Sequence, residues 1–235
     1  MVPLLLSLMV GCAPIYVPVA NNTPMFTGKN EFKAMAGIGY GVNLQAAYAC
    51  TDHLAVTANY LYRKFDEDTN GIKHQYGEIA LGYYVNFDQR GCFELFVGYG
   101  LGAGSAFDSA YNWFSVFGYN VRYEAAGKYH KAFIQPSIGL TEGRKKWNLS
   151  VRLNYVDFTD VHVQLNEDVL LDKRQSRLFI TPAATMLFPL WRNKIYGTAQ
   201  VGYNRHVGQE PDYDYDSGLL MLGLTYSIKK RKEKL

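Results

Sequence analysis

The chain has 235 residues, of which 48% are hydrophobic, 15% aromatic and only 19% charged, with a formal net charge of +3. This small charge, without a basic stripe interleaved with stacking aromatics, argues against nucleic acid as a partner. The hydrophobic content is too low for a helical membrane protein, but it suits transmembrane β-strands, in which only every second residue must face lipid.

Residues 1–11 contain a short apolar run that predicts an export signal peptide. The run 4–10 is too short to cross a bilayer, which takes about 20 residues, but it has the length of a signal-peptide core. The residues MVGC (9–12) resemble a lipobox, so we expect the mature chain to begin at Cys12 with a covalent lipid. No Lys or Arg precedes the run, and the alternative is a hydrophobic leader with an incidental cysteine.

Residues 12–30 are then expected to be a lipidated linker. Positions 13–30 hold three Pro and three Asn without any period, which favours an extended, irregular segment between the lipid and the first strand. Several acyl chains on one residue would hold the chain firmly on a membrane. Because no acidic pair follows Cys12, we expect the lipid in the inner leaflet.

From Glu31 on, hydrophobicity alternates with a period of two, which predicts β-strands. We expect an all-β, up-and-down antiparallel transmembrane β-barrel over residues 31–228, with ten strands and with eight or twelve as alternatives. Two interpretations of segment 107–127 remain, a tall hairpin or an extra strand pair. The expected strands are 31–40, 42–50, 53–64, 73–87, 92–106, 128–140, 145–157, 176–188, 193–205 and 217–228.

Short and long connections alternate along the chain, as they do in outer-membrane barrels with brief periplasmic turns and longer external loops. An even strand count puts both termini on the periplasmic side. The short connections and the tail 229–235 are basic, which suits the anionic lipid of an inner leaflet, whereas the long loops are mostly acidic. The sequence therefore predicts an outer-membrane location with both termini periplasmic.

The two faces of the expected strands differ in chemistry. One parity is apolar with aromatics near the ends, as a lipid face requires, and the other is small and polar. Glu78, Glu94 and Arg152 all have the second parity, which disfavours the rival soluble calycin-type barrel with a charged outer face. We expect these three residues to form an ion cluster in a narrow lumen, because an unpaired buried charge is very costly. The cluster would be a structural plug or, alternatively, a gate.

No motif predicts chemistry. The sequence contains no HExxH, no CxxC and no Gly-rich loop followed by a helix, and no histidine stands beside a candidate nucleophile. We therefore expect no catalytic residue, no metal site and no cofactor. Cys50 and Cys92 are expected to be two free thiols, with a disulfide as the alternative, because two other strands separate theirs.

The chain resembles small outer-membrane β-barrel lipoproteins of the Bacteroidetes type. The residues that carry the resemblance are MVGC (9–12), TPMFTGKNEF (23–32), LQAAYACTDHLAVTANY (44–60) and FIQPSIG (133–139). This resemblance implies a location and a fold, and it implies no activity because members of the family are largely uncharacterised.

These observations favour a non-enzymatic barrel with a packed polar lumen and a structural or surface-binding role. Its partners would be outer-membrane lipids and an extracellular ligand that the sequence does not name. A narrow pore for small solutes and a lipid hydrolase or acyltransferase are the alternatives. Candidate contact residues in segment 107–127 are Tyr111, Trp113, Phe114 and Tyr119.

Overall fold

The computed structural model describes residues 14–87, 90–112, 119–141, 145–166, 168–192, 194–208, 211 and 213–229. The expected signal peptide 1–11 and the end of the basic tail, 230–235, lie outside these residues. Strands are the regular structure of the described part, in which no helix is long and apolar enough to cross a membrane.

Ten strands build the body of the molecule. They are β1 (Glu31–Gly39), β2 (Val42–Ala49), β3 (Leu54–Asp66), β4 (Asn70–Phe87), β5 (Gly91–Asn112), β6 (Tyr119–Leu140), β7 (Lys146–Leu165), β9 (Gln175–Trp191), β10 (Ile195–Tyr203) and β12 (Gly218–Lys229). The short strands β8 (Asp168–Asp172) and β11 (Arg205–Val207) pair with the far ends of β7 and β9.

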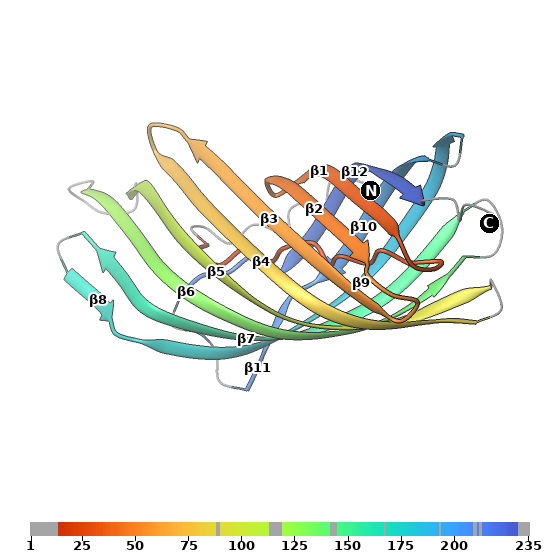
Figure 1. The fold of residues 1–235 in the computed structure, drawn as a ribbon. Coiled ribbons are helices and arrows are strands. Elements are labelled where there is room, and N and C mark those ends of the chain that lie inside the picture. Colours follow the sequence, from red (N-terminus) through yellow and green to blue (C-terminus); the bar gives the residue numbers. More distant parts are fainter. Residues whose placement is uncertain are drawn as a thin grey trace, which may run out of the picture.

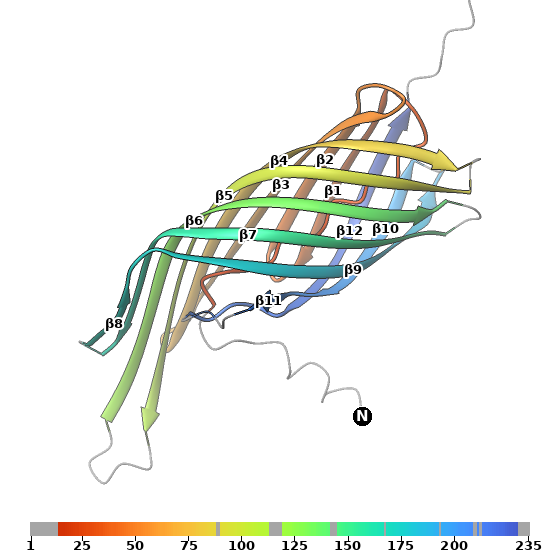
Figure 2. The same ribbon diagram turned by 90° about the horizontal axis from the view of Figure 1, so that it is seen from below.

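The sheet closes on itself. Each of the ten strands pairs antiparallel with its neighbours, β12 returns to β1, and β9 pairs with both β10 and β7. The result is a closed antiparallel barrel of ten strands, seen from two directions in Figures 1 and 2. The expected strand number and topology are confirmed, and the alternatives of eight and twelve strands are wrong.

The barrel is much taller on one side. Strands β4 to β7 have 18 to 22 residues, whereas β1, β2 and β10 have eight or nine. Segment 107–127 extends β5 and β6 upward, and these strands remain paired as far as Asn112 and Tyr119. The tall-hairpin interpretation is therefore right, and the extra strand pair is wrong. We call the end with these extensions the long-hairpin end and the opposite end the short-turn end (Figure 2).

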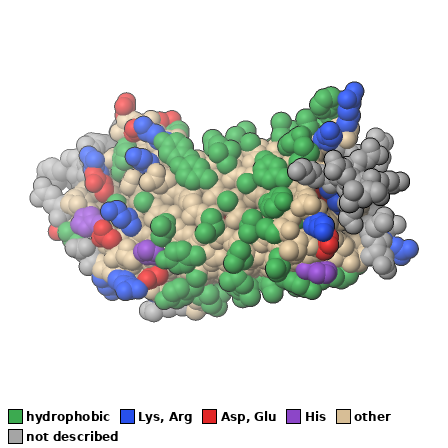
Figure 3. All heavy atoms as spheres, in the orientation of Figure 1, with side chains coloured by type: hydrophobic (Ala, Val, Ile, Leu, Met, Phe, Trp, Pro, Cys, Tyr) green, Lys and Arg blue, Asp and Glu red, His purple; other side chains and the backbone are tan. Residues whose placement is uncertain are grey.

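The outer wall is apolar through the middle of the barrel. Ile79, Leu81 and Leu149 point outward and are 70%, 71% and 63% exposed, while their polar neighbours in the chain point inward. Figure 3 shows hydrophobic side chains over the middle of one face and charged ones towards both ends. This distribution is the reverse of a water-soluble barrel and matches the expected lipid-facing parity.

The segment before β1 does not lie where the sequence analysis expects a linker. Every residue from 14 to 26 is buried, and in Figure 1 this segment runs lengthwise between the barrel walls. Pro14 lies at the long-hairpin end, whereas β1 begins, and β12 ends, at the short-turn end. The sequence predicts an extended linker over residues 12–30 but not its burial inside the barrel, and the described chain starts and ends at opposite ends of the barrel.

Candidate functional site in the barrel lumen

The segment inside the barrel, residues 14–27, is called the lumen segment below. Its sequence favours an extended chain: Pro14, Pro18 and Pro24 fix φ near −65° and cannot continue a helix. Proline also lacks an N–H group, which leaves fewer backbone donors to satisfy in a confined space. Several of the remaining polar groups of the segment form hydrogen bonds to the barrel wall and to the chain that leads into β12.

At the long-hairpin end, the lumen segment pairs with the chain that leads into β12. The backbone N–H of Ile15 donates to the carbonyl of Asp214 at 3.1 Å, and the N–H of Asp216 donates to the carbonyl of Tyr16 at 3.0 Å. The Tyr16 ring packs against Tyr129 and Phe179, with ring centroids 5.5 and 4.8 Å away. Tyr16 is 1% exposed and closes this part of the lumen.

Asp216 is anchored at the same mouth. Its carboxylate accepts a hydrogen bond from Nη1 of Arg63 at 2.6 Å. Burial raises the pKa of the Asp216 carboxyl to about 6, and the Arg63 guanidinium opposes this shift.

In the middle of the lumen, Asn21 is held by both its backbone and its side chain. Its N–H donates to Oε1 of Gln200 at 2.8 Å, and Nε2 of Gln200 donates back to the Asn21 carbonyl at 2.9 Å. The Asn21 side-chain amide donates to Oγ of Ser150 at 3.0 Å. A two-way bond of this kind replaces the ladder that an extended chain would form in a sheet.

Asn22 connects the lumen segment to the opposite wall. Its amide nitrogen donates to Oδ1 of Asn59 at 2.7 Å, and Nε2 of Gln135 donates to its carbonyl at 2.7 Å. Both wall residues are also hydrogen-bonded to buried charged side chains. Asn59 donates to Glu78, and Nε of Arg152 donates to Oε1 of Gln135 at 2.8 Å. One residue of the segment is thus linked to both members of an ion pair.

That ion pair is the electrostatic centre of the lumen. Glu78 lies 2.9 Å from Nη1 of Arg152 and 3.3 Å from Nζ of Lys131, and all three side chains are at most 2% exposed. The Tyr76 hydroxyl also donates to Glu78, at 2.5 Å. One carboxylate therefore serves two cations, and the ring faces of Tyr76 and Phe133 also attract Lys131 and Arg152, respectively.

Glu78 and Arg152, two members of the predicted ion cluster, are paired in the structure. Lys131 is a further member that was not predicted, although its inward position follows from extending the same alternation along β6. Glu94, the third expected member, lies apart: its carboxylate accepts from the N–H of Phe26 at 3.2 Å and from Oγ of Ser137 at 3.3 Å. Glu94 therefore holds the lumen segment and takes no part in the central pair.

Near the short-turn end, charged residues fix the point where the segment turns into β1. Nζ of Lys33 donates to the carbonyl of Met25 at 2.9 Å and lies 3.0 Å from Glu31. The Glu31 carboxylate also accepts from the N–H of Thr27 at 2.7 Å. The lumen segment is therefore bonded to the wall at both ends and in the middle.

Little open space remains around the middle of the segment. A cavity of about 30 Å³ lies between residues 21–24 and the wall formed by β1, β9, β10 and β12, which is room for a water molecule and not for a solute. Towards the long-hairpin end the lumen is filled by aromatic side chains, so the expectation of a polar filling throughout is wrong there. These side chains are Tyr16, Tyr76, Tyr129, Phe158, Phe179 and Tyr213.

Other candidate residues are less defined. Cys12, Trp113 and Phe114 lie outside the described residues, and only the backbone of Tyr111 and Tyr119 is described, in the last pairs of the β5–β6 hairpin. Cys50 and Cys92 are free thiols, as expected, the first exposed and the second buried. The described part of the chain holds no group of three or more His, Cys, Asp or Glu side chains placed to bind a metal ion.

Comparisons with known proteins find solved structures that are similar to this chain, at low sequence identity and with low TM-scores. No protein-family model and no curated protein matches the chain. Among solved structures, it is similar to the translocator domain of the autotransporter NalP from Neisseria meningitidis, with 10% identity over 83% of this chain and 86% of that one and a TM-score of 0.47. It is also similar to the N-terminal β-barrel domain of Pseudomonas aeruginosa OprF, with 10% identity over 86% of this chain and 100% of that one and a TM-score of 0.32.

Proposed function

We propose that this chain is an integral, non-enzymatic β-barrel of an outer membrane, closed to solutes by its own lumen segment. Its role would be structural, or would lie in binding through the long hairpins. The observation that carries the proposal is the unbroken burial of residues 14–26 inside the barrel, with hydrogen bonds to the wall along their length.

The outer wall supports the membrane location. The outward residues of β5 from Phe93 to Leu101 are apolar, and the most exposed of them are 36% to 56% exposed. This stretch of nine residues matches the length of a strand that crosses a membrane. Beyond this band the outward residues become polar, as Lys64 and Asp66 do on β3. A closed barrel leaves no unpaired strand edge, which a hydrocarbon environment demands.

The arrangement of the lumen supports a closed barrel. A conducting pore needs a continuous water path. In the part of the chain that the structure describes, Asn21, Asn22 and the Glu78–Arg152 pair occupy the middle of the lumen. Water-sized space beside residues 21–24 amounts to about 30 Å³. A packed polar centre of this kind is a plug.

Conductance of the purified full chain in planar bilayers tests the proposal. We expect a silent bilayer, and we expect a variant that lacks residues 14–27 to give conductance steps. The heat-dependent mobility shift typical of folded barrels on gels would verify that both proteins are folded. Steady conductance by the folded full chain would overturn the proposal.

The lumen segment also affects where a lipid on Cys12 would lie. Cys12 is two residues from Pro14, and two residues of extended chain span roughly 7 Å. Since Pro14 lies at the long-hairpin end, a lipid there would enter the leaflet at that end, and not the inner leaflet that the sequence analysis expects. Metabolic labelling with a radioactive fatty acid, lost on Cys12→Ala, tests for the lipid itself.

A further inference from the structure

The outer face of the barrel carries a furrow that is centred on β2 to β5 and bordered by residues of β1, β6 and β7. Two adjoining hollows of about 710 and 890 Å³ share Ile79 and Tyr99 as common lining residues. Small outward residues form the floor, namely Ala46 and Ala58, which are paired across β2 and β3, and Gly77 on β4. A Cβ added at Gly77 would meet only Tyr60 Cδ2, at 3.9 Å, so the furrow is open there.

Tall apolar side chains border this floor. Tyr60 and Leu101 flank Gly77 on the neighbouring strands, and Ile79 and Leu81 follow it along β4. Their exposed fractions lie between 44% and 71%. On β2 to β4 the furrow therefore has apolar walls, an apolar floor and an open side, which suits an acyl chain, whereas Gln75, Lys128 and His130 line its upper part.

Cations lie directly above the furrow, towards the long-hairpin end. Lys64 and Lys73 are opposite each other in the β3–β4 pairing, both exposed on the outer face. Like charges directly opposite on neighbouring strands destabilise a sheet. Lys73 is four residues from Gly77, about 14 Å along the strand, and Lys128 lines the upper end of the furrow.

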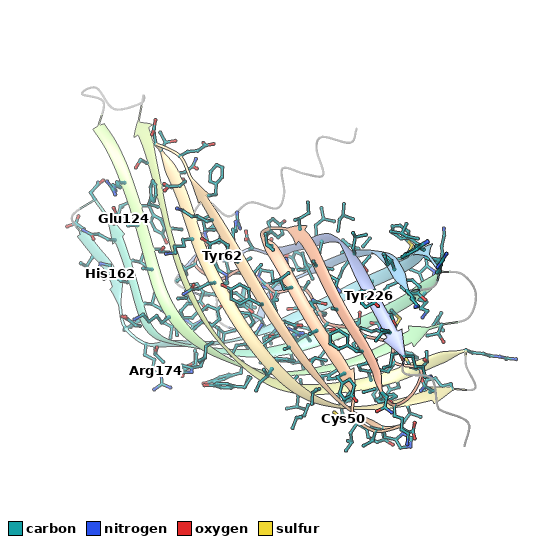
Figure 4. The ribbon with its side chains drawn as sticks, turned by 45° about the horizontal axis from the view of Figure 1, so that its top comes forward. Cys50, Tyr62, Glu124, His162, Arg174 and Tyr226 are labelled. Carbon is teal, nitrogen blue, oxygen red and sulfur yellow. The ribbon has the colours of Figure 1, made fainter. Side chains whose placement is uncertain are left out.

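Acidic groups lie beside and beyond these lysines. Asp66 and Glu124 line the next hollow, of about 430 Å³, together with Lys64 and Lys73, and Glu124 is paired with Arg122 there. Asp160 is opposite Lys128 on β7. The outward positions next to the apolar band are Tyr62 on β3 and Gln75 on β4, and the first charged positions beyond them are Lys64 and Lys73. Figure 4 places Glu124 and His162 beyond Tyr62, towards the long-hairpin end.

We propose that this furrow binds a phosphorylated lipid of the leaflet at the long-hairpin end. An acyl chain would lie over Ala46, Ala58 and Gly77, and a headgroup phosphate would lie between Lys64 and Lys73. Lys128 is opposite Asp160, so the headgroup cations are Lys64 and Lys73. Two adjacent cations favour a headgroup with more than one negative charge, which is the chemistry of a bisphosphorylated glycolipid of the lipid A class. The inference rests on the proposed membrane location, since water would fill the furrow of a soluble protein.

Native mass spectrometry of the delipidated full chain in detergent, titrated with lipid A, phosphatidylglycerol or phosphatidylethanolamine, tests the inference. We expect lipid A to bind most tightly. The double variant Lys64→Ala, Lys73→Ala should weaken lipid A binding about 25-fold, because each lysine near an anionic lipid contributes roughly a factor of five. Gly77→Leu should also weaken binding, because it fills the furrow without a clash.

Two variants are matched controls. Lys145→Ala with Lys194→Ala removes two cations at the short-turn end, and Ala36→Leu places a leucine side chain on the outer face of β1. Both should bind lipid A as the parent does. Equal binding of all three lipids, or a binding constant unchanged by both test variants, would overturn the assigned lipid site. If the chain instead remained dissolved and folded without detergent, the proposed membrane location would itself fail.

Discussion

At the scale of residues, the centre of the lumen holds one carboxylate and two cations. Glu78 contacts both Arg152 and Lys131, while Gln135 and Asn59 occupy further donors and acceptors of the group. A buried pair contributes little compared with an apolar core, but removing one partner leaves an uncompensated charge. The three residues are therefore unequal, because Glu78 is the shared partner.

We expect Glu78→Gln to destabilise the barrel by about 3–5 kcal/mol, because it leaves two buried cations without their anion. Arg152→Met should cost less, because Lys131 continues to neutralise Glu78. Urea unfolding in lipid vesicles, followed by tryptophan fluorescence, measures both free energies of unfolding. A larger loss for Arg152→Met than for Glu78→Gln would contradict this hierarchy.

At the scale of elements, the approach of the lumen segment to the wall depends on a glycine. A Cβ at Gly104 would lie 2.2 Å from the carbonyl oxygen of Ile15, a distance that real Cβ atoms do not adopt. Gly104 thus lets the segment lie flat against β5 at the point where Ile15 also bonds to Asp214. Any larger residue there must displace the segment, since the wall is a paired strand.

We expect Gly104→Val to loosen the upper part of the lumen segment while the barrel remains folded. Amide hydrogen exchange followed by mass spectrometry should show faster exchange at residues 15–17, because the Ile15 bond to Asp214 opens. Gly77→Val is the matched control, since its side chain would point outward into open space. Unchanged exchange in Gly104→Val would argue that the segment is held by its other contacts alone.

The strands and the lumen segment differ in how well the sequence predicts them. A barrel strand faces lipid on one side and the lumen on the other, and this difference produces the alternation that locates β4, β5 and β7. The lumen segment meets the wall on every side, so Ile15, Tyr16 and Val17 are all buried and no period arises. An extended chain with three prolines then looks like a linker, and its burial becomes visible only when the wall around it is known.

The candidate site shows the same division. Inward parity predicts the pairing of Glu78 with Arg152 because both lie on regular strands. Lys131 also has inward parity, on β6, and it joins the pair. Glu94 has inward parity as well, but it lies apart from the pair. Parity states which face a side chain occupies but not its height in the barrel. Heights follow from the register and shear of the closed sheet, which determine that Glu94 meets Phe26 and not Arg152.

At the scale of the whole molecule, the two ends of the barrel differ in form and in chemistry. The long-hairpin end carries the extensions of β4 to β7, while the short-turn end carries the tight connections and the exposed thiol of Cys50 (Figure 4). Outer-membrane barrels have their short turns in the periplasm and their longer loops outside. The proposed location therefore assigns the long hairpins to the cell exterior and Cys50 to the periplasm.

Thiol labelling of intact cells tests this orientation with a native residue. We expect a membrane-impermeant maleimide to leave Cys50 unlabelled until the outer membrane is permeabilised, while Cys92 stays protected by burial in both states. In a Cys50→Ser chain, Asp68→Cys in the exposed turn between β3 and β4 should be labelled on intact cells, with Cys50→Ser alone as the blank. Labelling of Cys50 but not of position 68 on intact cells would reverse the orientation. It would also move the lysines above the furrow to the periplasmic leaflet, because Lys64 and Lys73 belong to the same long-hairpin end as Asp68.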